Sequence, residues 1–128
     1  MVKLAVIGLG GRGRCNIQTL CSIEDVAIIS VCDPYEDRVA KTVEDLKKCG
    51  HEAQGFTDYK KALNVPGLDA VMIASGWQSH SQVALYALEK GIPVGCEVGG
   101  EYSLERCFEL VRTQEKTGTP YMFLENCC

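Results

Sequence analysis

The glycines near the N-terminus are the residues whose spacing most clearly indicates a chemical role. Gly8, Gly10 and Gly13 form the pattern Gly-x-Gly-x-x-Gly directly after a short apolar run. Where a strand turns into a helix, the first glycine allows a tight turn and the second lets the backbone approach a pyrophosphate. The third lets the helix pack close to the strand, and the free N–H groups at the helix start bind phosphate. The pattern predicts a dinucleotide site that also includes Gly11 and Arg12.

An acidic residue follows this pattern at the spacing that a dinucleotide site requires. Asp33 lies twenty positions after Gly13, at the end of a second apolar run. A carboxylate there accepts hydrogen bonds from the adenosine ribose and repels a 2′-phosphate, so Asp33 predicts NAD rather than NADP. The alternative is that Asp33 only caps the next helix, and the two roles are compatible. Arg38 either weakens the preference for NAD or is an ordinary surface residue.

Further polar and aromatic residues follow the later apolar runs. Ser75, Trp77 and His80 lie after the run that ends at residue 74, and Glu97 lies after the run 92–96. Ligands of parallel sheets bind at the carboxyl ends of the strands, so we expect these residues beside the cofactor. Five positions beyond the glycines and Asp33 are therefore candidate cofactor contacts, namely Ser75, Trp77, His80, Glu97 and Asn126.

Each of these candidates has an alternative interpretation. Trp77 either forms a wall beside the nicotinamide or packs under a neighbouring loop. His80 either donates to a cofactor or substrate oxygen, which makes it a weak catalytic candidate, or caps its helix. Glu97 is placed to bind the nicotinamide ribose. Arg12 either pairs with a phosphate or a substrate acid, or points into solvent.

Composition excludes several classes of function. The chain has 128 residues, a formal net charge of −4 and no basic cluster, which argues against nucleic-acid and anionic-membrane partners. No apolar run approaches the roughly 20 residues of a membrane span, and no signal peptide precedes the glycines, so we expect a cytoplasmic protein. None of the eight cysteines forms a CxxC pair, so we expect reduced structural thiols and no metal site.

Apolar runs alternate with amphipathic segments along the whole chain, which predicts an α/β fold with a doubly wound parallel sheet (Rossmann) of about six strands and flanking helices. Ser79 is expected to cap the fourth helix. Ser103 is expected to cap the last helix, with Leu104, Phe108 and Val111 on its inner face. We expect strands at 3–8, 26–32, 54–56, 68–74, 92–96 and 121–124. We expect helices at 11–23, from 34 to a stop at Gly50, at 59–63, at 80–90 and from 104 to a stop at Gly118.

The sequence resembles the N-terminal half of the glucose–fructose oxidoreductase / inositol dehydrogenase (Gfo/Idh/MocA) family over nearly its whole length. The resemblance rests on the glycine loop 8–13, on residues 32–34, on 69–74 leading to His80, and on 89–94 leading to Glu97. It implies a domain that binds NAD in an oxidoreductase acting on a sugar-like hydroxyl. Family members usually have Glu-Lys-Pro after the fifth strand, with a lysine that is often catalytic. This sequence has Val98 in place of that lysine.

Within the family, the chain is most similar to a branch that contains NAD-dependent glycosidases. Trp77 with His80, Glu97 with Val98, and residues 124–126 carry this resemblance. It implies tightly bound NAD and a transient oxidation of the sugar, followed by elimination, water addition and re-reduction.

The resemblance also implies a C-terminal domain for substrate and oligomer contacts, in a parent that could be a homo-oligomer. We expect residues 1–128 to be one dinucleotide-binding domain that is inactive alone. Three functions remain open for it. It is the NAD domain of an oxidoreductase, the NAD domain of a glycosidase, or a non-catalytic dinucleotide-sensing module.

Overall fold

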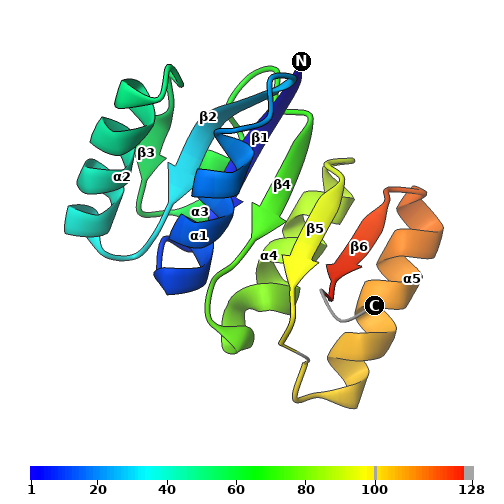
Figure 1. Cartoon of the computed structure of the whole chain (residues 1–128). Helices are drawn as coiled ribbons and strands as arrows, with labels where there is room; N and C mark the ends of the chain where they lie inside the picture. The colour runs from blue at the N-terminus through cyan, green and yellow to red at the C-terminus, as the bar shows by residue number, and fades with distance from the viewer. Residues whose placement is uncertain (100, 126–128) are drawn as a thin grey trace.

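A computed structural model of the chain describes residues 1–99 and 101–125. Its strands form one sheet in which every neighbouring pair is parallel (Figure 1). The spatial order is 3-2-1-4-5-6, which confirms the predicted doubly wound fold. The strands are β1 (Val2–Ile7), β2 (Val26–Cys32), β3 (Gln54–Phe56), β4 (Ala70–Ile73), β5 (Val94–Glu97) and β6 (Tyr121–Leu124).

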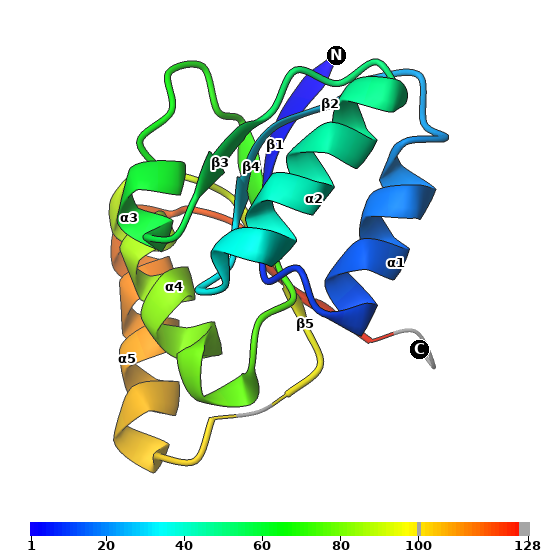
Figure 2. The ribbon, with the colours of Figure 1, turned by 90° about the vertical axis from the view of Figure 1, so that its left-hand side faces the viewer.

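The helices cover both faces of the sheet. Figure 2 shows α1 and α2 on one face, with α3, α4 and α5 on the other. Among the described residues, no helix has the combination of length and apolarity that a membrane crossing needs. The helices are α1 (Gly11–Leu20), α2 (Glu36–Lys48), α3 (Tyr59–Ala62), α4 (Trp77–Glu89) and α5 (Leu104–Thr117).

The central strand β1 shows why the strands are apolar at nearly every position. Leu4 and Val6 pack into the core under α1 and α2, whereas Ala5 and Ile7 pack into the core under α3 and α4. Successive side chains of a strand point to opposite faces, so a strand covered on both faces needs apolar residues throughout. This double burial confirms the interpretation of the apolar runs as strands of a parallel sheet.

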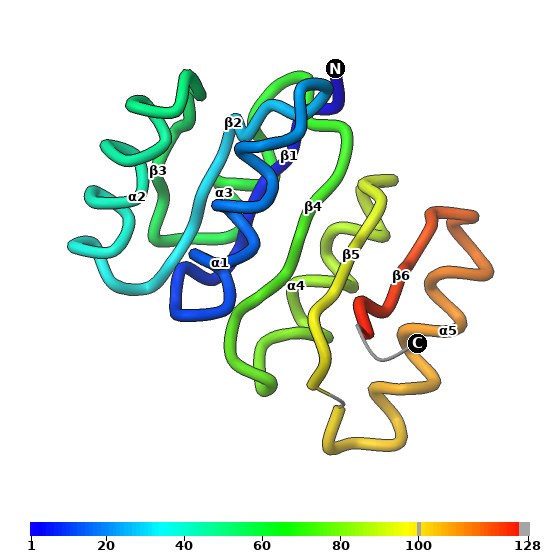
Figure 3. Tube along the Cα trace, in the orientation of Figure 1, coloured from blue at the N-terminus to red at the C-terminus, as the bar shows by residue number. Residues whose placement is uncertain are grey.

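The direction of the chain through the sheet reverses beside β1. After β1 the chain runs outward to β2 and β3, then returns to β4 on the other side of β1. In the orientation of Figures 1 and 3, α1 lies in front of the sheet and α4 lies behind it. The two connections leave β1 and β4 in opposite directions, so a crevice opens between them at the carboxyl ends of the strands.

Two predicted helix starts differ from the structure. Helix α4 begins at Trp77 with Gly76 as its N-cap, three residues before the predicted start at His80. The Ser79 hydroxyl lies inside the first turn and donates to the carbonyl oxygen of Gly76. Helix α2 begins at Glu36, so Pro34 precedes the helix instead of opening it.

The predicted inner face of α5 is wrong. Leu104, Phe108 and Val111 are all exposed, whereas Leu110 packs against the core. Helix α5 lies over the edge strand β6, with α4 as its neighbouring helix (Figure 1), so only a narrow stripe is covered. A helical period identifies apolar stripes, but it does not determine which of two adjacent stripes faces the sheet.

Because Leu88 of α4 is buried and Leu104 of α5 is exposed, truncating these two leucines should have contrasting effects on stability. Leu88→Ala, at a fully buried position of α4, should lower the free energy of unfolding by about 2–5 kcal/mol because it leaves a cavity. Leu104→Ala, at a position that is 67% exposed, should change it by less than about 0.5 kcal/mol. Urea denaturation followed by circular dichroism measures both. Equal losses would contradict the observed orientation of α5.

Candidate functional site

A groove of about 400 Å³ runs along the carboxyl ends of the strands. We call it the edge groove. It is open to solvent and contains residues from the connections after β1, β2, β3 and β4. Its lining includes six of the predicted site residues, namely Gly8, Gly10, Gly11, Arg12, Asp33 and Ser75. Residues that the prediction did not assign also line it, among them Tyr35, Thr57, Tyr59, Gly76 and Ser79.

The glycine loop lines the edge groove. At two of its positions the surrounding structure leaves no room for a side chain, so glycine is required there. Gly8 has a φ of +98°, where a side chain is strained, and a Cβ there would also overlap the backbone of Ser75. A Cβ on Gly13 would overlap the carbonyl oxygen of Gly8. Helix α1 can therefore press against the turn that precedes it, and its axis points at the edge of the sheet.

The other two loop glycines leave space instead. A Cβ on Gly10 or Gly11 would meet no atom within 4 Å. Gly10 is the N-cap of α1, and no described side chain caps the helix. The first N–H groups of a helix have no partner within the helix, and its dipole places positive charge there. This open, uncapped helix start fits a pyrophosphate.

Asp33 lines the edge groove beside the glycine loop and is only 3% exposed. Its Oδ2 accepts a hydrogen bond from the backbone N–H of Leu9 at 2.8 Å, and its Oδ1 accepts one from the N–H of Tyr35 at 3.1 Å. The N-cap of α2 is Tyr35, so Asp33 is not the cap. A carboxylate has about four acceptor positions, so two remain for ribose hydroxyls.

Arg38 lies beside this carboxylate. Its Nη1 is 3.8 Å from Asp33 Oδ2, and its guanidinium carbon is 4.5 Å from the centre of the Tyr35 ring. The side chain thus forms a flat, positively charged surface next to Asp33. The structure places Arg38 next to the predicted ribose-binding carboxylate, and its influence on cofactor choice stays a prediction.

His80 does not line the edge groove. The ring is 4% exposed, with Nε2 2.9 Å from the carbonyl oxygen of Ser75 and Nδ1 3.3 Å from that of Gly99. Both ring nitrogens face backbone acceptors, so His80 connects the loop before α4 to the loop after β5. This arrangement leaves no ring nitrogen directed at the groove.

Trp77 lies against the same loop. A Cβ on Gly99 would overlap the indole ring, so the ring rests directly on the glycine backbone. The side chain remains 55% exposed, at the first position of α4. The predicted packing on a neighbouring loop is observed, and the role of the exposed part of the ring as a wall beside the nicotinamide stays a prediction.

Glu97 lies on the other face of the sheet edge, in a second hollow of about 400 Å³. Its Oε1 accepts a hydrogen bond from Asn16 Nδ2 at 2.8 Å, and its Oε2 is 3.6 Å from Arg12 Nε. Arg12 lines both this hollow and the edge groove. The structure therefore pairs Arg12 with a carboxylate of the protein, which was not among its predicted partners.

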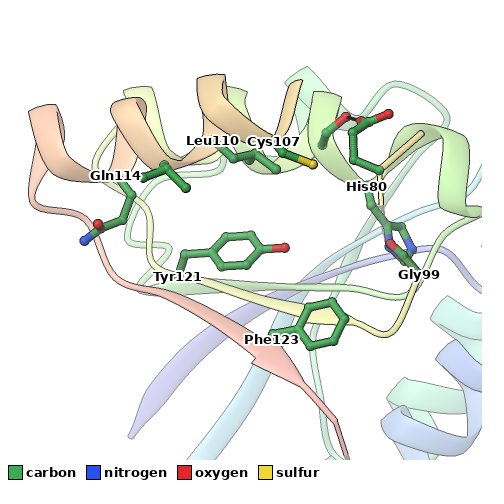
Figure 4. Close-up of a pocket in the computed structure, with 10 residues that line it drawn as sticks. His80, Gly99, Cys107, Leu110, Gln114, Tyr121 and Phe123 are labelled. Atoms are coloured by element: carbon green, nitrogen blue, oxygen red, sulfur yellow. Dashed lines mark hydrogen bonds between the residues drawn. The ribbon is translucent and has the colours of Figure 1, made fainter. Parts of the chain in front are cut away.

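A third cavity, of about 380 Å³, lies between α5 and the sheet. Figure 4 shows Cys107, Leu110 and Gln114 above it, with Tyr121 and Phe123 below. His80 and Gly99 lie side by side at one end. Glu101 also lines this cavity. Its carboxylate accepts hydrogen bonds from the Ser81 hydroxyl and from the backbone N–H groups of the two residues that follow it, and these bonds lower the pKa of the Glu101 carboxyl group. This cavity is separate from the edge groove.

The buried cysteines are not nucleophiles. Burial raises the pKa of the Cys32 thiol to about 12, and the nearby Asp33 adds to the effect. Burial raises the pKa of Cys96 to about 11, partly offset by a hydrogen bond with Tyr121. Thiolates are the reactive form of cysteine, so both residues act as small apolar side chains of the core.

Signals in the sequence could have identified some of the missed residues. Thr57 directly follows β3, and every strand end of this fold meets the same edge. Asn16 is four residues after Arg12, so the two share one face of α1. Tyr59 gave no comparable signal. The predicted contact Asn126 lies outside the described residues.

Comparisons with known proteins agree with this fold. Residues 2–124 match the sequence model of an oxidoreductase family with an NAD-binding Rossmann fold. An alpha-N-acetylgalactosaminidase of Bacteroides fragilis is 37% identical over an alignment of 132 positions. The alignment covers 100% of this chain and 31% of the relative. A glycosyl hydrolase family 109 protein of Stenotrophomonas maltophilia is 34% identical over 134 residues, covering 99% of this chain and 30% of the relative.

A solved structure shows the same fold together with a cofactor. Myo-inositol dehydrogenase of Lactobacillus casei, crystallised with NAD(H) and myo-inositol, superimposes with a TM-score of 0.83 at 26% identity. The match covers 91% of this chain and 34% of the dehydrogenase. The chain therefore spans about a third of the length of the proteins it matches.

The two classes of loop glycine should respond differently to substitution without any ligand. Gly13→Ala should lower the free energy of unfolding by about 1–3 kcal/mol, because the new Cβ overlaps the carbonyl oxygen of Gly8. Gly10→Ala should lower it by less than about 1 kcal/mol, since its Cβ enters open space and only the N-cap preference is lost. Thermal unfolding of the two variants measures the difference, and a more damaging Gly10→Ala would contradict the described loop.

Proposed function

Because the chain belongs to the Gfo/Idh/MocA oxidoreductase family, whose NAD-binding Rossmann domain it matches over residues 2–124, we propose that it is the cofactor domain of a longer enzyme that acts on a sugar-like hydroxyl. One observation carries the proposal. The uncapped N-terminus of α1 opens into the edge groove, and the buried Asp33 carboxylate lies in the same groove, at the end of β2. A pyrophosphate and the adjoining adenosine ribose need these two features within one site.

The edge groove accounts for the adenosine half of NAD. The pyrophosphate would lie on the N–H groups that follow Gly10, where no Cβ obstructs it. The adenosine ribose would donate two hydroxyl hydrogen bonds to Asp33, and its 2′ position faces a negative charge. Arg38 reduces this negative potential only partly, because its nearest nitrogen is 3.8 Å away. NAD is therefore favoured over NADP.

The nicotinamide half would lie toward β4 and β5. Ser75 lines the edge groove at the end of β4, and Trp77 stands at the start of α4. Glu97 ends β5 on the neighbouring side of the edge, where its carboxylate can accept from the second ribose. His80 contributes indirectly, since it joins the two loops that carry Ser75 and Gly99.

The described residues supply binding and orientation but no obvious proton acceptor for a sugar hydroxyl. NAD, when bound, supplies a hydride acceptor, while the hydroxyl proton must leave to a base as the carbonyl forms. Val98, where the family usually has lysine, carries no titratable group and is exposed. We propose that the base is supplied by residues outside this chain, and that the chain alone binds cofactor without turnover.

A second candidate function is glycoside hydrolysis, and two observations favour it. The relatives at 34–37% identity are named as glycoside hydrolases, and Val98 matches the Glu-Val pattern of the resemblance. In this case the hydride taken from the sugar returns to it, and the net reaction adds water across the glycosidic bond. The first step is the same oxidation, so the cofactor domain would have the same geometry.

NAD binding and its selectivity test the cofactor assignment. Millimolar NAD should raise the melting temperature of the chain, because a ligand that binds only the folded state stabilises it. Asp33→Asn should weaken NAD by about tenfold, the cost of weakening charge-assisted hydrogen bonds. It should weaken NADP less, because the charge that repels the 2′-phosphate is removed.

The control for this experiment is Asp25→Asn, which removes an equal charge from an exposed position just before β2, at the opposite edge of the sheet. It should leave both affinities within about twofold of the original, since an exposed charge contributes little. Isothermal titration calorimetry of the original chain and the two variants with NAD and NADP measures the dissociation constants. Equal losses of NAD and NADP in Asp33→Asn would show that Asp33 supports the loop only.

The two enzyme functions are separated by their products. In the complete enzyme that carries this domain, a dehydrogenase should accumulate reduced cofactor when a panel of sugars is added with NAD. A glycosidase should release the alcohol from an aryl α-N-acetylgalactosaminide without net reduction of NAD. Absorbance of the reduced nicotinamide and of the aryl alcohol distinguishes the two. If neither product forms, the non-catalytic sensing function is favoured instead.

A further inference from the structure

We propose that Asn16 and Arg12 are positioning residues that hold the Glu97 carboxylate where it binds the ribose on the nicotinamide side. This inference rests on the proposed function, since it concerns how the same cofactor is held. It assigns a role to Asn16, which the sequence did not indicate as a site residue.

The first argument is the geometry of the contact. Arg12 and Asn16 are one turn apart on α1, so their side chains project from the same face of the helix. Each reaches a different oxygen of Glu97, with Asn16 Nδ2 at 2.8 Å from Oε1 and Arg12 Nε at 3.6 Å from Oε2. Two contacts on two oxygens fix the rotation of the carboxylate as well as its position.

The second argument is the distance in the fold that the contact spans. Helix α1 follows β1, whereas Glu97 ends β5, which is two strands away in the sheet order. The side chain of Met72 on β4 lines the hollow beneath this contact. The contact therefore joins the helix that would bind the pyrophosphate to the strand end that would bind the nicotinamide ribose.

The third argument is electrostatic. The Glu97 side chain is only 13% exposed and ends close to the helix start where an anionic pyrophosphate would bind. Arg12 provides a countercharge to this carboxylate, which reduces its repulsion of the pyrophosphate. Asn16 is neutral, so it fixes the carboxylate without removing its capacity to accept. A carboxylate with about four acceptor positions retains places for ribose hydroxyls after these two contacts.

Three ligands of increasing length test the inference by calorimetry. ADP contains the adenosine and pyrophosphate only, ADP-ribose adds the second ribose, and NAD adds the nicotinamide. Asn16→Ala should weaken NAD and ADP-ribose by about tenfold, since a misplaced carboxylate loses its charge-assisted hydrogen bond. It should leave ADP within about twofold, because ADP has no second ribose for Glu97 to bind and Asn16 does not line the edge groove.

Two further variants complete the design. Asn16→Asp keeps the shape but places a like charge against Glu97, so it should weaken ADP-ribose more than Asn16→Ala does. Gln18→Ala removes an amide from an exposed position of the same helix and should change none of the three affinities. Glu97→Gln gives an independent result if the Asn16 variants fold poorly, and it should show the same selective loss of NAD and ADP-ribose.

The outcomes separate the inference from the function on which it rests. Equal losses of ADP and ADP-ribose in Asn16→Ala and Glu97→Gln would overturn it, because the contact would then support the loop as a whole. Loss of NAD without loss of ADP-ribose would also overturn it, since Glu97 would act on the nicotinamide ring. If the original chain binds neither NAD nor ADP, the proposed function itself fails.

Discussion

The close approach of α1 to the turn after β1 is the constraint on which the site depends. A Cβ at Gly13 would overlap the carbonyl oxygen of Gly8, so the helix can lie against the turn only because that atom is missing. The approach sets the direction in which the first N–H groups of α1 point. The hydrogen bond from the Leu9 N–H to the buried Asp33 carboxylate then ties the same turn to the end of β2. One backbone conformation thus places the proposed phosphate-binding and ribose-binding parts of the groove next to each other.

The rest of the carboxyl edge is built from contacts between connections that are distant in the sequence. His80 and Trp77 join the loop before α4 to Gly99, and Asn16 with Arg12 joins α1 to Glu97. These contacts lie on the side of the site where we propose that the nicotinamide binds. The chain spans about a third of its relatives' length.

Much of the fold could be predicted from sequence because its signals are local. The apolar runs of β1, β2 and β4 indicate strands buried on both faces, and alternation with helices indicates a parallel sheet. The helix ends were less accurate. The start of α4 was placed three residues late because Ser79 is a good N-cap by type, whereas the extended backbone of Gly76 takes that position. The inner face of α5 was wrong because two apolar stripes share one helical period, and the edge of the sheet covers only one of them.

For the site, the residues that could be predicted to lie together are those within one local unit of structure. Gly8, Gly13 and Asp33 belong to one continuous strand–turn–helix–strand unit, so the order of these elements is enough to bring them to the same edge of the sheet. The partners of Arg12, His80 and Glu97 depend on the long-range packing of the fold. Glu97, for example, contacts Asn16, which lies 81 residues earlier in the chain. The reason is physical, since strand order and sheet twist bring such segments together, and neither is encoded in the local period of the sequence.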